Sequence, residues 1–101
     1  MRVIVMFDLP VETAEDRKEY SHFRKFLLRS GFVMMQESIY TKIALNNTAV
    51  DSIKESVRKH KAKSGLIQML VITEKQFEKI EFVLGEEKTD IVNSSERLVV
   101  I

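Results

Sequence analysis

The sequence predicts an α+β domain in which one antiparallel sheet carries two helices on a single face. Apolar stretches with strand character occupy residues 3–7, 32–45 and 66–72. Between them, residues 13–30 and 48–60 repeat apolar side chains every three or four positions, which is the period of an α-helix. The resulting order is strand, helix, strand, strand, helix, strand. With right-handed crossovers this order builds a four-stranded antiparallel sheet, the ferredoxin-like βαββαβ arrangement.

Length and composition indicate one domain. A chain of 101 residues that is 45% hydrophobic can bury one core but not two. We expect the ferredoxin-like domain over residues 1–85, followed by a linker and an additional C-terminal strand over 86–101. No apolar run reaches the roughly 18 residues of a membrane span, and the first strand shows no secretory pattern. The chain has no cysteine, which excludes disulfides and thiolate metal sites and favours a cytoplasmic location.

Charge is divided along the chain. Residues 1–73 hold twelve Lys and Arg against eight Asp and Glu, a net charge of +4. Residues 74–101 hold four against seven, a net charge of −3. A basic body can meet phosphate groups, although most surface charge of this size is simply solvated.

The first strand is apolar on both faces and ends in a carboxylate. Side chains alternate along it, with Val3, Val5 and Phe7 on one face and Ile4, Met6 and Asp8 on the other. A strand of this kind is usually central and covered on both sides. The ionised form of Asp8 is then costly unless it is paired, solvated or bound to a metal. The alternative is that Asp8, followed by Leu9 and Pro10, merely starts a turn.

A helix follows the first strand, and two strands follow the helix. Thr13 and Asp16 have the spacing of a capping box, and Gly31 ends the helix as a left-handed residue. The apolar stripe of the helix is formed by Tyr20, Phe23, Phe26, Leu27 and Ser30. The apolar phase of residues 32–45 changes around 36–38, which predicts a tight turn or a bulge between two strands.

The second helix begins with another cap-like spacing, from Thr48 to Asp51, after a turn at residues 46–47. Its apolar stripe is formed by Val50, Ile53 and Val57, and His60 continues it, so we expect His60 to be a half-buried core residue. We expect the helix to fray through residues 61–64 and to stop at Gly65.

The C-terminal third predicts one more strand of the sheet and then shorter elements. Residues 66–72 are apolar on both faces, and Thr73 with Gln76 predicts a short capped helical turn. An apolar run at 82–84 and the polar segment 86–97 come next. The last four residues, 98–101, are wholly apolar and have strand character.

Two helices cover only one face of this sheet, although two of its strands are apolar on both. We therefore expect a homodimer in which a second copy covers the open face. If the dimer axis passes near the ends of the first strands, Asp8 of each copy reaches one spot. Mg²⁺, or Mn²⁺ in its place, needs only one or two carboxylates with water and phosphate oxygens, and such an ion promotes attack on a phosphodiester.

These residues resemble the CRISPR-associated Cas-two (Cas2) family of small adaptation proteins, in the branch found with single-effector systems. The matching stretches are Phe7-Asp8-Leu9-Pro10, Tyr20 to Leu27, Gly31 to Tyr40, Ile72-Thr73 with Gln76-Phe77, and Gly85. The resemblance implies a ferredoxin-like homodimer that assembles with the Cas-one integrase to capture and insert double-stranded DNA. It also implies a metal-dependent phosphodiesterase activity at the Asp8 position of some members.

The scaffold role ranks first, and an endonuclease acting on RNA or double-stranded DNA through Asp8 of both subunits is the alternative. The resemblance further suggests that Arg17, Lys18 and Arg24 bind phosphate oxygens. The alternative for Arg17 and Lys18 is pairing with nearby glutamates on the helix surface. The basic run at residues 58–63 ends a helix, where positive charge is favourable in any case, so a nucleic-acid contact there is left open.

Overall fold

Seven elements follow one another along residues 1–86, the part of the chain that the structure, a computed structural model, describes. They are β1 (Arg2–Asp8), α1 (Ala14–Arg29), β2 (Val33–Gln36), β3 (Ile39–Ile43), α2 (Asn47–Lys59), β4 (Leu66–Ile72) and α3 (Glu74–Glu78). This order confirms the predicted fold class and the short third helix. The strand expected at 98–101 lies outside the described residues.

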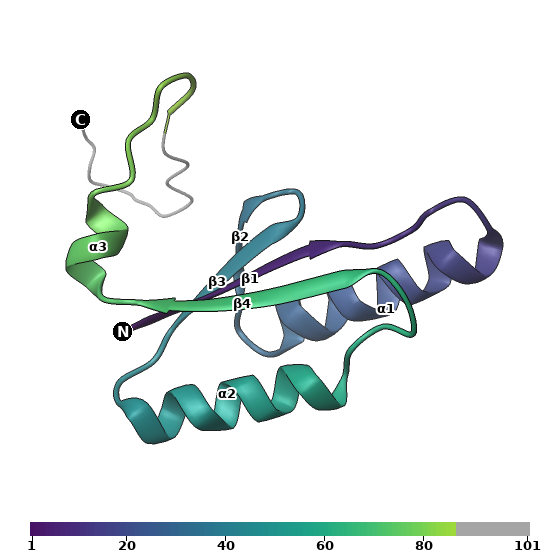
Figure 1. The fold of residues 1–101 in the computed structure, drawn as a ribbon, viewed down its shortest axis with the longest axis horizontal. Coiled ribbons are helices and arrows are strands. Elements are labelled where there is room, and N and C mark those ends of the chain that lie inside the picture. The colour runs from purple at the N-terminus through teal and green to yellow at the C-terminus, as the bar shows by residue number, and fades with distance from the viewer. Residues whose placement is uncertain (87–101) are drawn as a thin grey trace.

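The four strands form one antiparallel sheet in the order β2-β3-β1-β4. Strand β1 is central, as predicted, with Val5 opposite Tyr40 of β3 and Met69 of β4. Helices α1 and α2 lie on the same side of the sheet, and α3 lies beyond the end of β4, near the start of the chain (Figure 1). Strand β4 is apolar on both faces and yet lies at an edge of the described sheet, so its apolar character does not arise from a central position.

The core lies between the sheet and the two long helices. Val3, Val5 and Phe7 of β1 are buried against Phe23 and Leu27 of α1. The Phe7 ring meets the Phe23 ring edge-on, with centroids 5.1 Å apart. A fully buried side chain of this size contributes about 1.5–3 kcal/mol relative to exposure. The residues that precede Asp8 along β1 are thus anchored in the most tightly packed part of the domain.

Both predicted capping boxes at Thr13 and Thr73 are present. The Thr13 hydroxyl accepts the backbone N–H of Asp16 at 3.0 Å, and the Asp16 carboxylate accepts that of Thr13 at 3.2 Å. Thr73 and Gln76 make the same exchange at the start of α3. The prediction for α2 was wrong by two residues, because Asn46, in extended conformation, caps the helix through its side chain at 2.8 Å from Ala49 N.

A bulge separates β2 from β3, as the phase change predicted. The register shifts between Met34 and Gln36, and residues 37–38 form the turn. Beyond the ladder, the backbone N–H of Phe7 donates to the Ser38 carbonyl at 3.0 Å. The turn therefore supports β1 one residue before Asp8.

One further expectation needs correction. Helix α2 ends at Lys59 and does not fray through 61–64, because the N–H of His60 closes it on the Val57 carbonyl. The apolar run at 82–84 is exposed, with Leu84 at 95% of its full accessible surface. No helix within residues 1–86 is long and apolar enough to cross a membrane.

Candidate functional site

Asp8 is the last residue of β1 and belongs to the sheet face that α1 and α2 leave uncovered. Val3, Val5 and Phe7 face the helices, so the alternate residues, including Asp8, face away from them. The sequence placed Asp8 at the end of a buried strand, but its side chain is exposed. In the single chain the carboxylate is therefore open to solvent.

The backbone of Asp8 is held tightly although its side chain is free. Asp8 pairs with Leu66, the first residue of β4, and Gly65 precedes it with a φ of +101°. A Cβ atom on Gly65 would lie 2.8 Å from the Asp8 carbonyl oxygen and 2.8 Å from Leu9 Cδ2. Only glycine satisfies both the left-handed conformation and this close approach. Gly65 was predicted as a helix stop, and its role in positioning Asp8 was missed.

One chain offers few ligands for a metal at this point. Among residues 1–86, no three His, Cys, Asp or Glu side chains gather into a metal-binding group. Asp8 supplies one exposed carboxylate, and Mg²⁺ is satisfied by one or two carboxylates when water and phosphate complete its octahedron. The exposed strand end is compatible with such an ion, and a second carboxylate requires a second copy of the chain.

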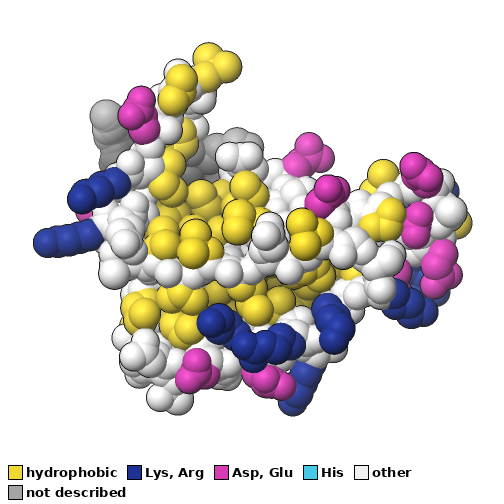
Figure 2. Space-filling view, viewed as in Figure 1, with side chains coloured by type: hydrophobic (Ala, Val, Ile, Leu, Met, Phe, Trp, Pro, Cys, Tyr) yellow, Lys and Arg dark blue, Asp and Glu magenta, His cyan; other side chains and the backbone are white. Residues whose placement is uncertain are grey.

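The face that α1 and α2 leave uncovered is largely apolar. Part of it is nevertheless buried, since Ile4 and its β3 partner Thr41 lie on this face and are only 7% and 3% exposed. Its strongly exposed hydrophobic side chains come from three strands and are Val33 (60% exposed), Ile43 (56%), Leu66 (53%) and Leu70 (49%). Figure 2 shows hydrophobic side chains on both sides of the β4 backbone. Contiguous apolar surfaces of this kind on a small domain mark sites of association.

Arg17, Lys18 and Arg24 do not form one surface. Arg17 and Arg24 are seven residues apart and share a side of α1, whereas Lys18 lies about 100° further round the helix. All three are exposed, but Arg17 Nη1 also donates to the carbonyls of Val11 at 3.2 Å and Glu12 at 3.0 Å. Arg17 therefore helps to hold the connection between β1 and α1.

The glutamates that were alternative partners for these cations face elsewhere. Glu15 lies 3.7 Å from the Lys63 ammonium, and Glu19 accepts the backbone N–H of Lys63 at 3.1 Å. Within residues 1–86, no ion pair joins either glutamate to Arg17 or Lys18. Helix α1 thus uses its acidic side chains to hold the segment that follows α2.

The far end of β1 carries an ion pair that sequence reasoning missed. Arg2 donates to both carboxylate oxygens of Glu74 in α3, at 2.8 and 3.0 Å. The hydrogen bonds from Arg2 hold the pKa of Glu74 below its ordinary value, with the charge of the guanidinium adding to the effect. No local signal predicts a pair between residues so distant in sequence.

The sequence of this chain is similar to that of a described protein family and of several named proteins. Residues 1–80 match the family described as CRISPR associated protein Cas2. A protein named CRISPR-associated endoribonuclease Cas2 from Treponema denticola is 54% identical over 101 residues, covering all of both chains. A protein of the same name from Streptococcus mutans is 48% identical over 99 residues, covering 98% of this chain and 91% of the other.

A solved structure shares the fold. The crystal structure of Streptococcus pyogenes Cas2 at pH 6.5 superposes with a TM-score of 0.63, covering 84% of this chain and 100% of the other at 22% identity. The family match over most of the chain and the identity with full-length relatives agree with the resemblance noted from the sequence. The chain belongs to the CRISPR associated protein Cas2 family.

Proposed function

We propose that this protein acts as a homodimeric, DNA-binding scaffold of CRISPR adaptation, which joins dimers of the Cas-one integrase around double-stranded DNA. The observation that carries the proposal is the uncovered apolar sheet face, with Asp8 at the end of its central strand. A second copy seated on this face removes its exposed apolar side chains from water. The commonest arrangement of two identical chains is a two-fold dimer in which the same surface is used twice.

DNA binding in this proposal is electrostatic and independent of base sequence. Arg24 and Lys18 are exposed on α1 and are free to meet phosphate oxygens. Phosphate contacts of this kind fix the position of a duplex but do not read its sequence. Affinity should fall steeply with salt, as expected when bound cations are released from DNA.

The oligomeric state of the purified chain tests the scaffold proposal. We expect a dimer at micromolar concentration by light scattering, and a monomer when Ile43→Lys and Leu70→Lys are combined. Leu28→Lys is the matched control, because Leu28 is 42% exposed but lies on α1. A wild-type monomer, or a dimer unaffected by the two sheet substitutions, contradicts the proposal. Co-purification of the full chain with a Cas-one homologue tests the partner separately.

A metal-dependent endonuclease is the second candidate. The relatives in Treponema denticola and Streptococcus mutans are named endoribonucleases, and the Asp8 carboxylate is exposed and accessible. Asp8 from each of two copies would hold one Mg²⁺ or Mn²⁺, which would polarise a phosphodiester of RNA or double-stranded DNA. The two candidates are compatible, since one dimer axis serves both.

The substitution Asp8→Asn tests the nuclease. It keeps the size of the side chain and removes its charge, so the dimer should persist while Mg²⁺-dependent cleavage of labelled RNA and duplex DNA is lost. Cleavage that survives in the variant, or that proceeds equally in chelator, rules out the Asp8 mechanism. If neither substrate is cleaved by the wild-type chain, the scaffold proposal stands alone.

A further inference from the structure

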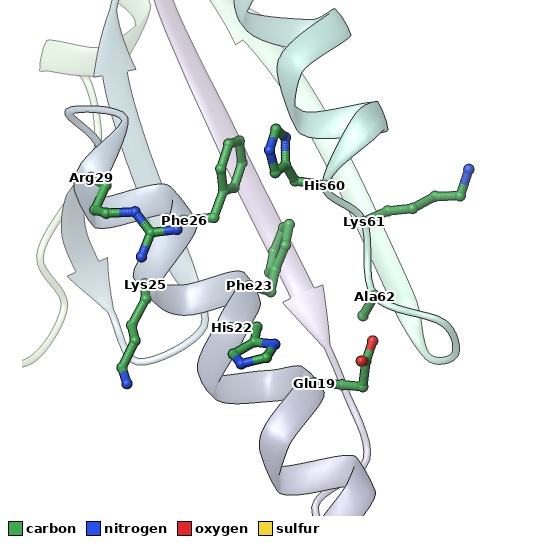
Figure 3. A pocket seen from close by; sticks show the side chains of 9 residues that line it. All are labelled: Glu19, His22, Phe23, Lys25, Phe26, Arg29, His60, Lys61 and Ala62. Atoms are coloured by element: carbon green, nitrogen blue, oxygen red, sulfur yellow. The ribbon is translucent and has the colours of Figure 1, made fainter.

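The groove between α1 and the end of α2 brings together two basic stretches that are far apart in sequence. Its volume is about 440 Å³. His22, Lys25 and Arg29 line it from α1, and His60 and Lys61 line it from the segment that ends α2 (Figure 3). This groove belongs to the helical layer, on the opposite side of the sheet from the uncovered face.

The α1 side of the groove is a stripe of basic side chains. Residues 18, 22, 25 and 29 recur at steps of four, three and four, so they share one side of the helix. Lys18 therefore extends the row formed by His22, Lys25 and Arg29 toward the start of α1. The sequence had singled out Lys18 together with Arg17 and Arg24, from which the helix geometry separates it.

The other side of the groove is fixed in place by an aromatic stack. The His60 ring lies on Phe26 with centroids 4.1 Å apart and an interplanar angle of 9° (Figure 3). His60 Nδ1 lies 2.8 Å from the Ser56 carbonyl, which ties the ring to its own helix. His60 is thus exposed and stacked, and the expectation that it is half-buried in the core was wrong. The stack sets the separation between the α1 stripe and Lys61.

Within residues 1–86, the lysines and the arginine that line the groove form no ion pair, whereas two cations near them do. In the basic run that ends α2, Arg58 pairs with Glu55 at 3.1 Å and Lys63 pairs with Glu15 at 3.7 Å. Over the described range 1–86, no ion pair involves Lys25, Arg29 or Lys61. Glu19 is the acidic side chain of the lining, and it already accepts the backbone N–H of Lys63. The groove therefore keeps a net positive charge.

We propose that this groove binds the phosphate backbone of duplex DNA. An acidic peptide would need apolar pockets for anchoring side chains, but Phe23 and Phe26, the two phenylalanines of the lining, are only 1% and 7% exposed. A phosphate backbone needs only well-placed cations. The inference rests on the proposed function for its ligand class, and it adds a contact surface on the helical layer that is independent of Asp8 and of the uncovered sheet face.

Salt-dependent binding of a fluorescent mixed-sequence duplex tests the groove. The variant Lys25→Gln/Arg29→Gln/Lys61→Gln removes three charges, and each lost phosphate contact makes the negative slope of log K against log salt shallower by about 0.9. We expect this slope to become shallower by about 2 to 3. The control Lys54→Gln/Lys75→Gln/Lys79→Gln removes the same charge away from the groove, and its slope should change by well under half as much.

A second measurement uses the unaltered chain. Lysine acylation in the presence of duplex should protect Lys25 and Lys61 but leave Lys75 reactive. Equal slopes for the two triple variants would contradict the proposal that the groove binds duplex DNA. Equal reactivity of these lysines with and without duplex would contradict it as well. If the groove variant binds like the wild type while Arg24→Gln weakens binding, the groove fails and the scaffold proposal survives. Absence of any duplex binding by the wild-type chain overturns both.

Discussion

Arg2 and Glu74, separated by 72 positions, form a two-point ion pair that joins the first strand to the last described helix. The Arg2 guanidinium also lies over the Phe77 ring, 3.9 Å from its centroid. These contacts hold α3 at the start of β1, which is the opposite end of the strand from Asp8. One strand therefore carries the candidate site at one end and the attachment of α3 at the other.

Attachment of α3 should weaken in acid. Arg2 lowers the pKa of Glu74 in the folded state, so the ion pair adds stability above the ordinary pKa of 4.5 and loses it as pH falls through the lower folded value. We expect the protection factors of the α3 amides, which are corrected for intrinsic exchange, to fall as the pH drops below 4.5. Glu74→Gln should give low protection at neutral pH and no further loss from this group. Protection factors that do not change with pH in the wild type would contradict the role of the pair.

Gly65→Ala should cost far more stability than a comparable substitution at Gly31. Both glycines have positive φ, +101° and +93°, which costs a residue with a Cβ about 1–2 kcal/mol. At Gly65 the new Cβ also meets the Asp8 carbonyl at 2.8 Å, whereas at Gly31 the nearest atoms lie 3.6 Å away on the flexible Lys42 side chain. We expect losses of about 3 and about 1 kcal/mol in urea unfolding. Equal losses would show that the approach to Asp8 is not limiting.

Substitutions at Arg17 and Arg24 should affect different properties, the free energy of unfolding for Arg17 and the affinity for duplex DNA for Arg24. Arg17→Gln removes the hydrogen bonds to the Val11 and Glu12 carbonyls and should lower the free energy of unfolding by about 0.5 kcal/mol, since the site is exposed. Arg24→Gln should leave unfolding unchanged and weaken duplex binding, because its side chain is exposed on the helix. Urea titration and salt-dependent anisotropy of both variants give the comparison. A larger loss of unfolding free energy for Arg24→Gln than for Arg17→Gln would contradict this prediction.

The sequence predicted the fold because the apolar pattern and the fold agree at every strand and long helix. The boundaries of α2 were less predictable, because Asn46 and Thr48 both offer capping side chains and only the backbone conformation selects Asn46. Helix α2 stops where the His60 N–H bonds to the Val57 carbonyl. The stack of His60 on Phe26 is a contact between elements, which periodicity along one helix does not reveal.

The candidate site was predictable in identity but not in setting. Asp8 was identified from its place at the end of an apolar strand, yet its exposure depends on which sheet face the helices leave uncovered. Gly65 looked like a helix stop because a glycine after a helical stretch has the same local signature in both roles. Lys25 and Lys61 line one groove only because the two helices pack side by side, which the sequence alone does not show.

Tyr40→Phe should leave the protein as stable as the wild type or more so. Tyr40 belongs to β3, and its side chain is fully buried in the core, where its ring stacks on Phe7 with centroids 5.7 Å apart. Its hydroxyl has no hydrogen-bond partner within the described part of the chain. A buried unsatisfied hydroxyl costs about 1–3 kcal/mol, so its removal relieves a penalty while the ring keeps its packing. Thermal and urea unfolding of the variant measure the change.

The control for this prediction is Tyr20→Phe. Tyr20 also packs against Phe7, at 5.9 Å between centroids, but it is only partly buried, so its hydroxyl reaches water and its removal should be nearly neutral. A loss of more than about 1 kcal/mol for Tyr40→Phe would show that its hydroxyl has gained a partner, such as a buried water. Tyr40 of β3 lies opposite Val5 of the central strand β1. A partner of its hydroxyl would therefore lie inside the core that positions β1 and Asp8 at its end.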